Sequence, residues 1–137
     1  MGRALGIDFG TKRVGLALSD RSNMIASPYK TLNYVSEKDL ITQLEIIVTK
    51  NDIEILVLGL PIKLKGEDTM QTTKVRNFKE ILSTLGIPIV FEDERLSSVS
   101  AINSLMLQNV KTGHNKSEID KTAAAIILQQ YLDKNSN

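Results

Sequence analysis

Carboxylates at three separate places in the chain are the side chains best suited to chemistry. Asp8 lies in an alternating apolar segment, three consecutive acids occupy 92–94, and Asp120 lies about one turn before Ala123 and Ala124. Hard oxygen ligands from separate elements suit Mg²⁺ or Mn²⁺ better than zinc. Two such ions about 4 Å apart can activate water and stabilise the leaving oxygen in phosphodiester cleavage.

The rest of the composition narrows the chemistry to these acids. The 137 residues include no cysteine, which excludes disulfides, thiolate nucleophiles and zinc–cysteine sites. The only histidine, His114, is expected in a solvated loop, with phosphate contact or proton transfer as its alternative roles. The net charge of +1 does not indicate a nucleic-acid binder, so any basic surface has to be local. The candidates for holding substrate phosphates are Lys12, Arg13, Arg95 and Lys121.

Asp8 and Asp120 each have a purely structural explanation as well. Asp8 can end a strand and support the turn at Gly10. Asp120 forms Ser-x-x-Asp with Ser117, a capping-box pattern that explains it as well as a site does. In favour of a site, Asp120 is predicted on the helix face that packs against the sheet, where an acid is costly unless it is paired or coordinated.

The three consecutive acids present a different choice. Like charges this close repel each other unless a cation lies among them, and a bound metal would supply that cation. Strand alternation places Glu92 and Glu94 on one side and Asp93 on the other. The residues alone therefore leave open whether Asp93 or Glu94 faces a site.

The elements that must position these acids alternate between strands and helices. Strands are predicted at 5–9, 14–19, 25–32, 55–60 and 87–91, and helices after Ser36, over 75–85, through 101–106 and from Ser117. The first two strands form an antiparallel hairpin, and Pro28 places the third at an edge. The order predicts one α/β domain over 1–137, in which strands 1–3 precede parallel strands and helices cover both faces of the mixed sheet.

Location and assembly are constrained less tightly. No apolar run approaches the roughly 20 residues that cross a bilayer, and the first residues lack the pattern of a secretory signal. We therefore expect a cytoplasmic protein without a membrane partner. No heptad or exposed apolar helix chooses between a monomer and a homodimer.

Four motifs, in order along nearly the whole chain, resemble those of the YqgF (RuvX) family. They are GIDFGTKRVG at 6–15, GLP at 59–61 with Gly66 downstream, DERLSS at 93–98, and Asp120 followed by AA at 123–124 and ILQ at 127–129. The resemblance implies a ribonuclease H-like fold and a divalent-metal nuclease. It implies that Asp8, Glu94 and Asp120 are the catalytic and metal-binding residues, and so prefers Glu94 to Asp93.

The same resemblance suggests the substrate. Members of this family are described as nucleases of pre-16S ribosomal RNA, and earlier as Holliday junction resolvases. We expect processing of the 5′ end of the ribosomal RNA precursor, with branched DNA as the alternative substrate. The loop before the last helix is often densely basic in such proteins, but here it offers only Lys111, His114 and Lys116.

Other functions stay open at this point. Asp-x-Gly-Thr after a strand also resembles the phosphate loop of actin-like ATPases and sugar kinases, which clamp nucleotide between two domains where this chain has length for one. A dinucleotide site is disfavoured because Gly6, Gly10 and Gly15 do not form Gly-x-Gly-x-x-Gly. The more serious alternative is a non-catalytic RNA-binding assembly factor, which would function without Asp8.

Overall fold

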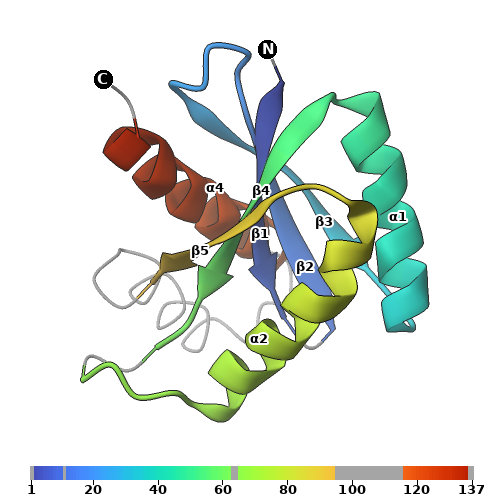
Figure 1. The fold of residues 1–137 in the computed structure, drawn as a ribbon, viewed down its shortest axis with the longest axis vertical. Coiled ribbons are helices and arrows are strands. Elements are labelled where there is room, and N and C mark those ends of the chain that lie inside the picture. Colours follow the sequence, from blue (N-terminus) through green and yellow to red (C-terminus); the bar gives the residue numbers. More distant parts are fainter. Residues whose placement is uncertain (1, 11, 63–64, 95–115, 136–137) are drawn as a thin grey trace.

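A mixed five-stranded sheet forms the centre of the computed structural model, which describes residues 2–10, 12–62, 65–94 and 116–135 (Figure 1). Its strands are β1 (Arg3–Phe9), β2 (Arg13–Ser19), β3 (Ala26–Asn33), β4 (Ile53–Leu60) and β5 (Ile89–Asp93), in the order β3-β2-β1-β4-β5. β2 runs antiparallel to both β1 and β3, whereas β4 runs parallel to β1 and β5. The predicted hairpin-led sheet with parallel strands after it is confirmed.

Proline explains why β3 lies at the edge of the sheet. Pro28 has no N–H to donate to a ladder, and it pairs with Ala17 where the β2–β3 register shifts. An edge strand tolerates this loss because one of its sides has no neighbouring strand. The predicted edge position of this segment is confirmed.

Helices cover both faces of the sheet (Figure 1). α1 (Glu37–Lys50) and α2 (Met70–Leu82), with the 3-10 turn η1 (Ser83–Leu85), pack on one face, and α4 (Lys116–Asn135) packs on the other. Gly86 ends the α2–η1 segment at φ 74°, a left-handed conformation that costs glycine little. The helix predicted over 101–106 lies outside the described residues. None of the described helices is long and apolar enough to cross a membrane.

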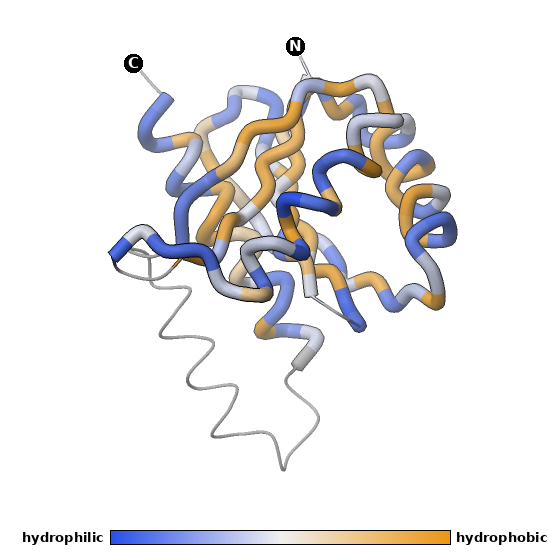
Figure 2. The backbone as a smooth tube through the Cα atoms, turned by 60° about the horizontal axis from the view of Figure 1, so that its bottom comes forward, coloured by the Kyte–Doolittle hydropathy of each residue, from blue (hydrophilic) through white to orange (hydrophobic). Residues whose placement is uncertain are grey.

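The two faces of the sheet carry different cores. Large side chains fill the core under α1 and α2, among them Leu5, Ile7, Leu16, Leu58 and Phe78. Small side chains dominate the core under α4, which includes Ala4, Ala17, Ala123, Ala124 and Ala125. Figure 2 shows the hydrophobic residues concentrated along the inner strands, with hydrophilic and hydrophobic residues alternating along α1. The small residues let α4 approach the strands more closely than the other helices can.

The glycines on β1 and β2 show how closely α4 packs against these strands. A Cβ added to Gly6 would lie 2.7 Å from Leu128 Cβ and 2.9 Å from Ala124 O, and one added to Gly15 would lie only 2.1 Å from Asp120 O. These positions leave no room for any side chain. The backbone of α4 therefore rests directly on the two strands that carry Asp8 and its neighbours.

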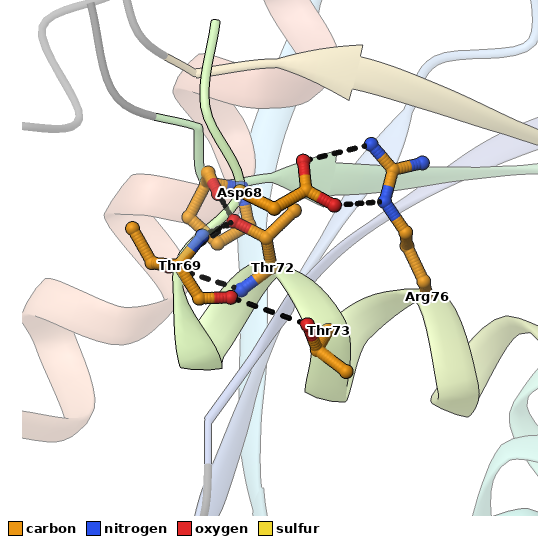
Figure 3. A network of polar contacts seen from close by, with 6 residues as sticks. Asp68, Thr69, Thr72, Thr73 and Arg76 are labelled. Carbon is orange, nitrogen blue, oxygen red and sulfur yellow. Dashed lines mark hydrogen bonds and ion pairs between the residues drawn. The ribbon is translucent and has the colours of Figure 1, made fainter.

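Threonine side chains begin α2 and tie it to the end of β4 (Figure 3). Thr69 caps the helix by accepting from Thr72 N, and Thr72 Oγ1 accepts from Thr69 N at 2.9 Å. The buried Thr72 hydroxyl also donates to Pro61 O, directly after β4. Asp68 adds an exposed two-pronged ion pair with Arg76, at 3.0 and 3.2 Å.

Replacing Thr72 with valine tests this attachment. The variant keeps the shape of the side chain but leaves Thr69 N and Pro61 O without their partner, so we expect unfolding free energy to fall by about 2 kcal/mol. Urea unfolding followed by circular dichroism measures it. The matched Thr73→Val removes an exposed hydroxyl and should change stability by less than about 0.5 kcal/mol. Equal effects of the two substitutions would contradict the assigned role of Thr72.

Candidate active site

Asp8 lies on β1 between two glycines of the neighbouring strands. It pairs directly with Gly15 of β2. Ile7 pairs with Leu58 of β4, so the next residues along these parallel strands are Asp8 and Gly59. Strand alternation puts Asp8 on the same face as Gly6, which contacts α4. The Asp8 carboxylate is therefore flanked on both neighbouring strands by glycine, which has no side chain.

Asp120 lies over the glycine on the β2 side. Its backbone carbonyl covers Gly15, and its side chain is turned inward with the residue only 9% exposed. Arg13 Nε donates to Asp120 Oδ2 at 2.7 Å. α4 begins at Lys116, so Ser117 lies inside the helix and its pairing with Asp120 as a capping box is not observed. The prediction that Asp120 lies on the sheet-facing side of the helix is confirmed.

Glu94 lies over the glycine on the β4 side. A Cβ added to Gly59 would lie 3.1 Å from Glu94 Oε2, and the Glu94 residue is 7% exposed. Its backbone N–H donates to Leu60 O at 3.2 Å, which holds the end of β5 against β4. Alternation turns Asp93 to the opposite face. Of the two acids left open by the sequence, Glu94 is the one that neighbours Asp8.

The charges of these three acids are coupled through Asp8. Burial and, as a smaller contribution, the nearby charge of Asp120 raise the pKa of Asp8 to about 7. Burial raises the pKa of Glu94 to about 8, with the charges of Asp8 and Asp93 adding to the effect. Asp8 is thus the central member of a row that runs Asp120, Asp8, Glu94.

The four cations predicted to bind phosphate have different surroundings. Arg13 is engaged by Asp120, and Lys121 pairs with Glu118 of its own helix at 2.9 Å. Lys12 is exposed at the turn between β1 and β2. Arg95 lies outside the described residues, and so does His114. Among Lys12, Arg13 and Lys121, the three that the structure describes, Arg13 is the one that forms an ion pair with the row of acids.

Oxygen donors of the row match a hard divalent cation in kind. Within the described residues, however, no group of three acidic or histidine side chains already converges as a metal cluster would. Asp120 directs one oxygen to Arg13, and Asp8 interacts with each neighbour separately.

Sequence reasoning missed two features of this site. Glu92 is also buried, where it accepts from Gln130 and, at 2.7 Å, from Lys134 of α4. Gln130 donates as well to Asp93 O at 2.9 Å, so it fixes the strand end from which Glu94 projects. The alternation of the acids was a usable signal for Glu92, which shares a face with Glu94. No local pattern signals the Arg13–Asp120 pair, whose members are 107 residues apart.

Comparison with known sequences places the chain in a family. The RuvX family, described as Holliday junction resolvase, matches residues 2–134. A protein of Crocosphaera subtropica is 42% identical over 96% of this chain and 92% of its own length, and one of Dictyoglomus thermophilum is 40% identical over 98% and 97%. Both carry the provisional name pre-16S rRNA nuclease.

Solved structures give the fold. T. thermophilus RuvC in complex with a Holliday junction substrate aligns with a TM-score of 0.56 at 12% identity, covering 98% of this chain and 95% of that one. The Fowlpox virus resolvase with its Holliday junction aligns with a TM-score of 0.54 at 9% identity, covering 98% and 99%. These likenesses confirm the predicted ribonuclease H-like fold. From its sequence matches, the chain belongs to the RuvX (YqgF) family and is a nuclease.

Proposed function

We propose that this nuclease hydrolyses phosphodiester bonds at a divalent-metal site formed by Asp8, Glu94 and Asp120. One observation carries the proposal: Asp8 rises between Gly15 and Gly59, and the other two acids lie over these same glycines. Buried carboxylates with raised pKa values are common where a protein holds a cation or moves a proton. If Asp8 only supported a turn and Asp120 only capped a helix, these acids would not need to be enclosed or to lie next to each other.

The residues of the chain have distinct tasks in this scheme. Bound Mg²⁺ or Mn²⁺ supplies an activated water and stabilises the leaving oxygen. The glycines beside Asp8 leave room for the α4 backbone at Gly15 and for the Ile127 side chain at Gly59, and this close packing brings Asp120 and Glu94 next to Asp8. Arg13 neutralises Asp120 and is close enough to the row to hold a substrate phosphate. Lys12, Lys121 and Arg95 would extend the contact along the nucleic-acid backbone.

The substrate we propose is the precursor of 16S ribosomal RNA, cut at its 5′ end in the cytoplasm. The names of the relatives support this choice. A four-way DNA junction is the second candidate, supported by the description of the family. Resolution of a junction needs two paired cuts, so it would require a homodimer, whereas a monomer can process RNA. A non-catalytic assembly factor is disfavoured because binding alone does not require three acids brought together in one row, two of them buried.

Single substitutions test the proposed site. We expect Asp8→Asn, Glu94→Gln and Asp120→Asn each to reduce cleavage at least about 100-fold, because each removes one of few ligands of the same cation. The matched control is Asp93→Asn, which changes the neighbouring acid on the opposite face and should keep most of the activity. Rates are measured on labelled RNA with Mg²⁺, Mn²⁺ or chelator. Cleavage that survives in the Asp8 and Asp120 variants would reject the site.

The same assay distinguishes the substrates. Precursor RNA carrying the 5′ flank of 16S ribosomal RNA and a four-way DNA junction are incubated separately with the wild-type protein. We expect metal-dependent cleavage of the RNA and little of the junction. Paired symmetric cuts in the junction, with intact RNA, would replace the proposed substrate by branched DNA. Nucleic-acid binding without any cleavage would favour the assembly factor.

A further inference from the structure

A pocket of about 390 Å³ opens beside the end of β1, between the beginning of α1 and the middle of α2. Its lining residues are Phe9, Tyr34, Ser36, Glu37, Lys74 and Asn77. Phe9 directly follows Asp8, and the Cα atoms of consecutive residues are about 3.8 Å apart. Because alternate residues of a strand face opposite ways, the pocket and the row of acids lie on opposite faces of one strand end. A strand of nucleic acid crossing this end can reach both.

Aromatic rings form a fixed platform in the pocket. Phe9 stacks on the buried Phe78 with centroids 4.2 Å apart and on Tyr34 at 6.2 Å. The Tyr34 hydroxyl donates to Gly10 O at 2.7 Å, and Gln71 donates to Phe9 O at 2.8 Å. These bonds hold the half-buried rings in place, so a planar ligand would pay little to order them. Stacked bases prefer such aromatic surfaces.

Polar groups around the rim suit the edge of a base. Lys74 and Asn77 are three residues apart on α2 and exposed, so they project from the same side of the helix. Glu37 lies at the start of α1, close enough for its charge to contribute to the raised pKa of Tyr34. An ionised carboxylate only accepts, and an amide both donates and accepts. Guanine presents two adjacent N–H donors on its Watson–Crick edge, which a carboxylate can accept together.

We propose that this pocket binds one unpaired base of the nucleic acid next to the cleaved phosphate, with a preference for guanine. Tyr34, which Phe9 backs, stacks with the base, Glu37 accepts from its N1–H and amino group, and Asn77 adds a second polar contact. Lys74 and Ser36 are positioned to contact its phosphate or carbonyl oxygen. The proposal rests on the proposed nuclease function and adds a determinant of cleavage position to it.

Binding in the absence of cleavage tests the pocket directly. Affinity is measured by fluorescence anisotropy, in chelator, for labelled short oligouridines that carry one central guanosine, adenosine, cytidine or abasic position. We expect the guanosine RNA to bind most tightly. Tyr34→Leu should weaken its binding about tenfold, the usual effect of losing one stacked base. Glu37→Gln, a surface change that should not disturb folding, should abolish the preference for guanosine.

Matched controls separate contact with the base from a change in the fold. Tyr29→Leu changes a half-buried tyrosine on β3, away from the pocket, and should leave affinity unchanged. The abasic RNA should bind wild-type and Tyr34→Leu protein equally. Equal affinity of the wild-type protein for all four RNAs would contradict base binding in the pocket. So would a loss of affinity in Tyr34→Leu that is as large for the abasic RNA as for the guanosine RNA. If Asp8-dependent cleavage persists in that case, only this inference fails. If no RNA binds at all, the proposed function fails with it.

Discussion

Asp8→Asn is expected to abolish cleavage and, in the same protein, to raise the melting temperature of the metal-free form at pH 8. The asparagine keeps the shape of the side chain but removes a buried charge that Asp120 and Glu94 oppose. One unit of pKa shift corresponds to about 1.4 kcal/mol. Allowing for partial exposure and coupling, we expect a gain on the order of 2 kcal/mol, or about 6 °C for a chain of this size.

The sign of the pH dependence follows from the direction of the shifts. Asp8 and Glu94 have folded pKa values of about 7 and about 8, above their ordinary values of 3.8 and 4.5. Folding therefore favours their protonated forms, and this stabilisation is complete below about pH 4. It is lost as the pH rises through 7 and 8. The metal-free wild-type protein should melt lower at pH 8 than at pH 5, and Asp8→Asn should reduce the difference.

Thermal melts in chelator at the two pH values measure this effect. Glu45→Gln, which neutralises an exposed acid on α1, should leave both melting temperatures unchanged. Adding Mg²⁺ at pH 8 should stabilise the wild-type protein and have little effect on Asp8→Asn. Combining Asp8→Asn with Glu94→Gln should give less than the sum of the single gains, because the charge of Asp8 raises the pKa of Glu94. If Asp8→Asn melts at a lower temperature than the wild-type protein, charge repulsion among the acids does not destabilise the metal-free fold.

Local rules predicted most of the fold because they act over a few residues. Ser36 begins α1 by accepting from Asp39 N at 3.1 Å, as its position in the sequence indicated. The Asp39 carboxylate accepts from Val35 N, one residue earlier than a standard capping box requires. Gly86 ends the second helical segment, and Pro28 lies on an edge strand. Each of these outcomes depends on the backbone preferences of single residues.

Boundaries shifted where tertiary contacts outweigh local preference. The last strand was predicted to end at Phe91, but β5 continues to Asp93. Acidic residues are poor strand formers, yet Glu92 pairs with Gly59 and its carboxylate is held by Gln130 and Lys134 from α4. Those partners lie about 40 residues away and cannot be inferred from the strand itself. This extension carries Glu94 into place over β4.

The candidate site was only partly predictable, because local patterns do not show which distant residues come together. The faces on which Asp8 and Asp120 lie followed from periodicity, and the preference for Glu94 came from family resemblance. Periodicity says which face a residue occupies, but not what lies opposite it across the sheet. The contacts of Asp120 with Gly15 and of Glu94 with Gly59 arise from the crossing of α4 and the pairing of β5. Only the assembled structure contains this information.

Gly15→Ala is expected to disable the nuclease without touching any proposed ligand. The added Cβ would lie 2.1 Å from Asp120 O and 2.3 Å from Asp120 C, both backbone atoms of α4. Gly15 lies on a strand paired on both sides, so the strand cannot retreat and the helix must move outward. That movement carries Asp120 away from Asp8. A displacement of about 1 Å at a catalytic group can lower the rate about 100-fold, and overpacking costs about 1–3 kcal/mol.

Gly6→Ala is the matched control, since it presses on the same helix about one turn further along. Its Cβ would meet Leu128 Cβ at 2.7 Å and Ala124 O at 2.9 Å, away from the acids. Both variants should melt at lower temperature than the wild-type protein. Measured well below both melting temperatures, cleavage should fall far more in Gly15→Ala than in Gly6→Ala. Equal losses would mean that α4 matters only as a packing element. Full activity in Gly15→Ala would show that the distance between Asp120 and Asp8 does not limit the reaction.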